Sequence, residues 1–153
     1  MPTPEAHLFD ITRVIQLAIA PVFMLTAVAS IINALLGRLA RAVDRRRAVD
    51  GLLPAQEGDA RDDLVDELKL LARRIGLVLW AIAFAVLSAL MVCLLIGTAF
   101  LGAYLTLDLS RTLAILFIAS VMALTVCLLL FMREVFLAAL SGQYEVRVRR
   151  VST

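Results

Sequence analysis

The sequence predicts an all-α integral membrane protein with three transmembrane helices, the first two of which extend into a cytoplasmic helical hairpin. Three observations predict this fold. Three runs of 24, 33 and 21 residues contain no charged residue, and a highly charged segment separates the first run from the second. A helix needs about 20 apolar residues to cross a hydrocarbon core of roughly 30 Å. Hydrophobic residues make up 62% of the chain, against about 45–50% in average soluble domains.

The first charge-free run, 14–37, is expected to remain in the protein as a span. A secretory signal has a basic leader and a short apolar core of about 7–15 residues. Here the leader contains Glu5, Asp10 and a single arginine, Arg13, and the cluster of arginines follows the run instead of preceding it. The run is also longer than such a core. We therefore predict a retained transmembrane helix.

A polar stripe follows one face of this first span. It consists of Gln16, Thr26, Ser30 and Asn33, with Phe23 in the same sector of about 100°. Two interpretations stay open. The stripe can pack against other spans through hydrogen bonds between helices. Alternatively, several copies can arrange it around an axis as the lining of a pore, with Phe23 at a hydrophobic constriction.

The segment 38–74 predicts a pair of helices that project from the membrane as a hairpin. The apolar stripe of the first helix continues past Gly37, and Gly51 and Pro54 are stop signals. A second helix is expected to start near Asp59, where acidic residues favour the amino-terminal end of a helix dipole. The alternative is a solvated, charged loop.

Charge supports antiparallel pairing in this hairpin. Folding the chain about residue 54 places Arg41 near Glu67 and Arg45 near Asp63. Each exposed pair contributes only about 0–1 kcal/mol. We therefore expect these pairs to set the register and the choice of partner more than the stability.

Small residues recur at four-residue spacing in the second span, about 75–102, and the third span, about 112–132. Helices in lipid associate through close packing of such residues. We expect the two stripes to contact each other, or the same stripe in another subunit. Their members are Ala81, Ala85, Ala89, Cys93 and Gly97 in the second span, and Ala119, Ala123 and Cys127 in the third.

Beyond the third span, the sequence predicts that the helix ends at Ser141 and Gly142. A basic C-terminal tail, 141–153, then alternates apolar and charged residues. This tail is interpreted as a segment near anionic headgroups, with a short strand or a partner-induced strand as alternatives. The whole chain, 1–153, is expected to form a single membrane domain.

The distribution of basic residues predicts the orientation. Thirteen of the 15 basic residues lie in 38–74 or after the third span, which three spans place on one side. Lys and Arg are enriched on the cytoplasmic side. We expect a multi-pass protein of the bacterial inner membrane, with the N-terminus outside and the C-terminus in the cytoplasm.

No pattern in the sequence indicates catalysis. None of the spans contains an ionisable residue of the kind that proton-coupled transporters use. His7 is the single histidine, and Cys93 and Cys127 lack metal-ligand spacing. We therefore predict no enzyme activity, no cofactor and no metal site. The net charge of +2 gives no argument for nucleic acid as a partner.

The stretch Ile15–Arg47 resembles a family of small bacterial membrane proteins, the domain of unknown function 2721. The resemblance is carried by the Ala-Pro-Val-Phe segment around Pro21, and by the Gly-Arg-Leu-Ala-Arg junction at 37–41 followed by Asp44 and Arg45. It covers about residues 8–140. The resemblance implies a bacterial membrane protein and supplies no activity or site residue.

These observations favour a small non-enzymatic protein of the inner membrane. We expect the lipid bilayer and further copies of the chain as partners, and a cytoplasmic or membrane protein docked on the hairpin, in a scaffold or accessory role. The alternative is an oligomeric pore for ions or solutes, lined by the polar stripe of the first helix.

Overall fold

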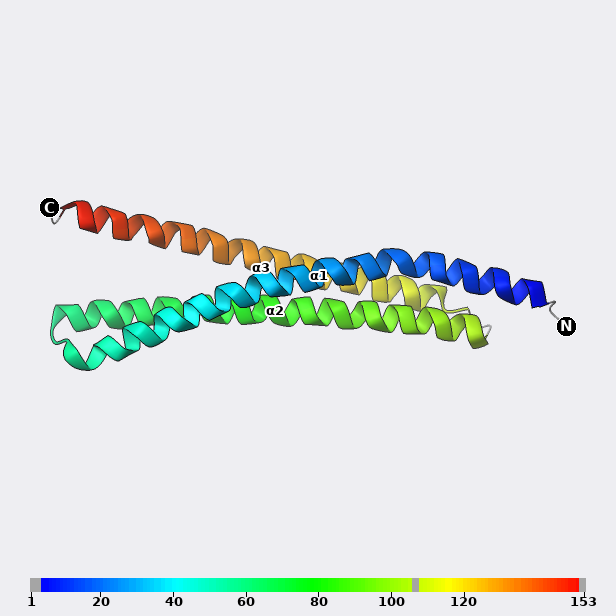
Figure 1. The fold of residues 1–153 in the computed structure, drawn as a ribbon, viewed down its shortest axis with the longest axis horizontal. Helices are drawn as coiled ribbons and strands as arrows, with labels where there is room; N and C mark the ends of the chain where they lie inside the picture. The colour runs from blue at the N-terminus through cyan, green and yellow to red at the C-terminus, as the bar shows by residue number, and fades with distance from the viewer. Residues whose placement is uncertain (1–3, 106–107, 152–153) are drawn as a thin grey trace. The chain divides into compact units, whose positions relative to one another are not determined.

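The protein consists of three long helices. The computed structural model describes the backbone of residues 4–105 and 108–151, and the side chains of residues 19–105 and 108–137. The helices are α1 (Pro4–Leu52), α2 (Asp59–Leu105) and α3 (Ser110–Val151), with a short 3-10 helix, η1 (Leu53–Ala55), after α1 (Figure 1). All three are long and apolar enough to cross a membrane. The predicted all-α, three-span fold of a multi-pass membrane protein is confirmed.

The chain divides into two compact units, and each helix contributes one part to each unit. The span unit comprises Met1–Ile32 and Phe84–Thr125. The hairpin unit comprises Asn33–Ala83 and Val126–Thr153. The hairpin unit thus holds the end of α1, the start of α2 and the second part of α3.

Buried positions recur every seven residues along each helix. A repeat of seven residues over two turns keeps one stripe on the same face, which is the register of left-handed helix packing. Within the described side chains, this stripe contains Val28, Leu35 and Val49 in α1, Leu71, Val78, Ala85 and Val92 in α2, and Ser120, Cys127 and Glu134 in α3.

The contact stripe within one chain differs from the predicted stripe of four-residue steps. Ala81, Ala85, Ala123 and Cys127 are buried, and Ala89 is half-buried, whereas Cys93, Gly97 and Ala119 are exposed. Each step of four residues turns about 40° past one full turn of a 3.6-residue helix. The predicted stripe therefore rotates away from the neighbouring helix. The buried stripe of α2 instead alternates steps of four and three residues, from 81 to 85, 88 and 92.

The turn of the hairpin has a local explanation. Pro54 lies in the first turn of η1, where its missing amide hydrogen costs nothing. Gly58 then adopts a φ of 65°, a left-handed conformation that favours glycine. Its carbonyl accepts the amides of Arg61 and Asp62 at 3.0 and 3.3 Å, which starts α2. The predicted helical hairpin is confirmed, and the alternative of a charged loop is excluded.

The start of α3 uses a side-chain hydrogen bond. The Asp108 carboxylate accepts hydrogen bonds from the Ser110 hydroxyl at 2.5 Å and the Ser110 amide at 3.2 Å. Both bonds stabilise the charged form and lower the pKa of Asp108, the hydroxyl contributing most. This turn lies outside the charge-free runs, so water can reach it.

The prediction that α3 ends at Ser141 and Gly142 is wrong, because the helix continues to Val151. A glycine ends a helix when it takes the left-handed conformation, and Gly142 is helical. In a helix interior, Gly costs only about 1 kcal/mol relative to Ala. A backbone that is helical to Val151 also excludes the predicted alternative of a strand in the tail. The tail side chains lie outside the described residues.

Candidate functional site

The first charged residues beyond the apolar runs meet in the hairpin unit. Arg38 follows the first run directly, Arg74 precedes the second, and Glu134 comes two residues after the third. They lie on three successive helices, of which α2 runs antiparallel to α1 and α3, and their contacts bring the ends of the runs to a common level. Ionisable side chains are disfavoured inside a hydrocarbon core and gather at its borders.

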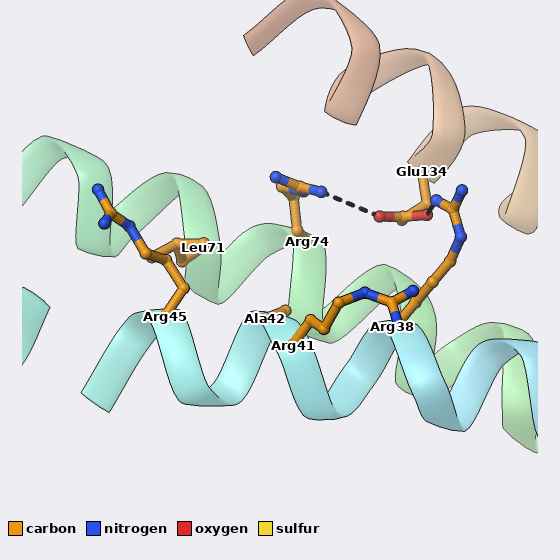
Figure 2. Close-up of a pocket in the computed structure, with 7 residues that line it drawn as sticks. All are labelled: Arg38, Arg41, Ala42, Arg45, Leu71, Arg74 and Glu134. Atoms are coloured by element: carbon orange, nitrogen blue, oxygen red, sulfur yellow. Dashed lines mark hydrogen bonds and ion pairs between the residues drawn. The ribbon is translucent and has the colours of Figure 1, made fainter. Parts of the chain in front are cut away.

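Glu134 joins all three helices. Its carboxylate accepts a hydrogen bond from Arg74 Nη2 at 3.2 Å, and its other oxygen accepts one from Arg38 Nη1 (Figure 2). The Glu134 side chain is only 4% exposed. The Arg38 guanidinium also lies over the Phe131 ring, 5.2 Å from its centroid. We call Glu134, Arg38 and Arg74 the Glu134 cluster.

The Glu134 cluster is an ion-pair network that stabilises the packing of the three helices. A buried carboxylate is strongly disfavoured unless it is paired and hydrogen-bonded. Two guanidinium groups supply that pairing here. One donor is left over, because Arg74 Nε is buried and has no hydrogen-bond partner among the described residues.

A pocket of about 360 Å³ opens beside this cluster, and we call it the arginine pocket. Its walls come from all three helices (Figure 2). In the described part of the chain, no three His, Cys, Asp or Glu residues come close enough to hold a metal ion. The chemistry of the pocket is therefore that of guanidinium groups. Its lining residues are Arg38, Arg41, Ala42, Arg45, Leu71, Arg74 and Glu134.

Arg41 and Arg45 differ in how they are held. Arg41 Nη1 lies 3.7 Å from the position that a Cβ on Gly37 would occupy, so its side chain folds back along α1. Among the described residues, Arg41 has no ion-pair partner. Arg45 Nε, in contrast, donates to Glu67 Oε1 at 2.7 Å. Arg41 thus contributes positive charge to the pocket without a matching carboxylate.

The predicted hairpin pairs are shifted by one helical turn. Arg45 pairs with Glu67 and not with Asp63, and Arg41 does not pair with Glu67. The prediction placed the fold at residue 54. Because α1 runs to Leu52 and α2 starts only at Asp59, the pairing is centred near residue 56. When the centre of an antiparallel hairpin shifts by two residues, the partner of each residue on the opposite helix shifts by four residues.

The polar stripe of α1 is exposed within a single chain. Phe23 is 72% exposed, and Thr26, Ser30 and Asn33 are exposed as well. The Thr26 and Ser30 hydroxyls donate to carbonyls of their own helix, at 3.4 and 3.0 Å. Gln16 has its side chain outside the described residues. The described stripe therefore does not pack against the other spans of the same chain, as one interpretation expected.

Sequence reasoning missed the Glu134 cluster, although a signal for it was present. It used Arg38 and Arg74, among other basic residues, only to predict orientation, and it assigned Glu134 no partner. Ser120, Cys127 and Glu134 are spaced seven residues apart along α3. This spacing places the Glu134 carboxylate on the packed face of the helix. That register was not visible from the spacing of small residues alone.

Residues 18–142 of the chain match the family model described as "Protein of unknown function (DUF2721)". The chain belongs to this family. The resemblance seen in the sequence is thereby confirmed, and the matched region includes the arginine pocket and the whole hairpin. No curated protein and no solved structure matches the chain. The description of the DUF2721 family names no activity.

Proposed function

We propose that this protein is a small, non-enzymatic, homo-oligomeric protein of the bacterial inner membrane. In this proposal, copies of the chain associate through the polar stripe of α1. The charged hairpin, 38–74, acts as a scaffold or accessory surface that docks a partner. The proposal rests on one observation. The described residues of the polar stripe are exposed along an apolar helix.

The stripe supports association because a bare polar face is unfavourable in lipid. The Thr26 and Ser30 hydroxyls are satisfied by their own backbone. The exposed Asn33 amide has no hydrogen-bond partner among the described residues. An amide without partners in an apolar medium costs a few kcal/mol, and interhelical contacts of Asn recover part of that cost. A buried Asn between helices also selects the number of chains that assemble.

The hairpin supports the second half of the proposal. Most basic residues of the chain lie in the hairpin or after the third span, and this distribution supports a cytoplasmic hairpin by the positive-inside rule. Arg46, Arg47, Asp62 and Asp63 are all exposed on it. Interspersed charges of this kind give specificity and speed to association with a protein partner.

The subunit count tests the proposed assembly. We would measure the mass of the full-length protein in nanodiscs by native mass spectrometry, for the wild type and for Asn33→Leu. We expect an oligomer for the wild type and a shift towards smaller species for the variant. Ala29→Leu is the control, because Ala29 is exposed and one turn before Asn33 on the same helix but lies outside the sector of the stripe. A wild type that stays monomeric overturns the proposal.

A pore lined by the same stripe is the second candidate. The specific observation in its favour is the ring of Phe23, which is 72% exposed in line with the polar residues. Apolar rings of this kind gate pores by excluding water. Conductance of the wild type in planar bilayers, altered by Phe23→Ala, would support the pore. A wild-type oligomer that never conducts would remove it.

A further inference from the structure

We propose that the arginine pocket binds the phosphate of an anionic phospholipid headgroup. The site is formed by side chains of α1, α2 and α3 within the hairpin unit. Charge, free donors and position along the helices each point to this ligand.

The charge of the pocket calls for an anion. Four guanidinium groups line it, against the single carboxylate of Glu134. One further carboxylate, Glu67, pairs with Arg45 from outside the lining. Among the described residues, Arg41 has no carboxylate partner, so its positive charge in the pocket is unmatched there. Guanidinium groups recognise phosphate oxygens through paired, charge-assisted hydrogen bonds.

The pocket also contains donors that its own carboxylates leave unused. Arg74 Nε is buried and lacks a partner among the described residues, and Arg41 makes no ion pair there. A buried donor without an acceptor is uncommon and calls for an explanation. Phosphate oxygens in the pocket would supply acceptors for the Arg41 guanidinium, which is exposed and lines it. Glu134 pairs with Arg38 and Arg74. The guanidinium groups of these two arginines are therefore ordered before the ligand binds.

The position of the pocket favours a lipid over a soluble anion. Arg38 and Arg74 flank the first two charge-free runs directly, and charged residues at the ends of apolar spans are expected near the headgroups. Basic pockets between spans at this depth suit anionic headgroups. Apolar side chains on the same helices, Leu36, Met132 and Phe136, are exposed and suited to acyl chains. A free phosphate ion would make no use of these side chains.

The test uses the full-length protein in a neutral detergent and short-chain phosphatidylglycerol as the probe. Isothermal titration calorimetry would compare it with phosphatidylcholine of the same chain length and with inorganic phosphate. We expect saturable binding of phosphatidylglycerol, and much weaker binding of the other two. Replacing one arginine in the site, Arg41→Gln, should weaken the binding about fivefold.

Arg46→Gln is the matched control, because Arg46 is exposed on the same helix, carries the same charge and does not line the pocket. We expect its binding to equal that of the wild type. Equal losses in the two variants would show general attraction to a basic surface and overturn the proposal. Inorganic phosphate bound as tightly as the lipid, or no saturable lipid binding, would overturn it as well. The readout does not depend on the number of subunits.

Discussion

The span unit and the hairpin unit share one packing register but use different chemistry in it. In the span unit, the buried polar contact is a hydrogen bond from Ser88 Oγ to the Ser120 carbonyl, at 2.8 Å. In the hairpin unit, the buried polar contact is the Glu134 cluster. Ser120 and Glu134 are two heptads apart on the same face of α3.

The difference follows from position along the helices, because segments inside and outside the charge-free runs tolerate different buried polar groups. Charged groups are costly in hydrocarbon, whereas a hydroxyl that donates to a backbone carbonyl is neutral and fully paired. Beyond the charge-free runs, water and headgroups reduce the cost of ions. The same packed positions can therefore hold a carboxylate and its arginines. The substitutions below test whether the two units are stabilised as differently as this comparison implies.

The largest effect is expected for Glu134→Gln in the hairpin unit. The change leaves Arg38 and Arg74 facing each other without a carboxylate. Breaking a buried pair costs about 3–5 kcal/mol, and we expect roughly 2–4 kcal/mol because both arginines are partly exposed. Unfolding by sodium dodecyl sulfate, followed by circular dichroism in neutral detergent, measures it. Glu67→Gln removes the same charge from an exposed pair and should cost less than about 1 kcal/mol.

In the span unit, Ala85→Leu is expected to have the next largest effect. Ala85 is fully buried on α2, and extra methylene groups in a packed contact cost about 1–3 kcal/mol. Cys93→Leu, on the same helix and in the same predicted stripe, should change stability by less than about 0.5 kcal/mol, because Cys93 is exposed. The same unfolding assay compares them. Equal losses would show that the stripe with four-residue spacing packs against another subunit after all.

A smaller effect is expected for Ser88→Ala, which removes a buried hydroxyl that donates across helices in the span unit. Hydrogen bonds between membrane helices contribute about 0.6 kcal/mol on average. We expect a loss of this size, well below that of Glu134→Gln. Ser30→Ala should be neutral, since its hydroxyl bonds only to its own helix. A loss above about 2 kcal/mol for Ser88→Ala would contradict the contrast between the two units.

The smallest effect is expected for the exposed pair of the hairpin. A double-mutant cycle on Arg45 and Glu67 should give a coupling of about 0.2–1 kcal/mol that declines with added salt. A second cycle on Arg45 and Asp63 should give none, because the pairing is centred near residue 56. A larger coupling in the second cycle would restore the register predicted from the sequence.

Most of the candidate site could not be predicted from the sequence. The sequence shows that Arg38 and Arg74 stand directly beside the first two charge-free runs. The sequence could not show that both arginines converge on Glu134, which lies 60 residues beyond Arg74 along the chain. Contacts at such separations depend on how far each helix is rotated, and within one chain the spacing of small residues does not coincide with the buried face beyond Ala85.

The sequence by itself determined the three helices, their membrane character and the hairpin between the first two. Long charge-free runs and turn residues determine local structure, so each helix and turn can be predicted from its own segment of the sequence. The tertiary structure decided the register. It alone shows that the helices pack at seven-residue intervals, that Arg45 pairs with Glu67, and that the arginine pocket forms beside Glu134. Register depends on the rotation and offset of whole helices, and a change of two residues at the turn moves every partner by a full turn.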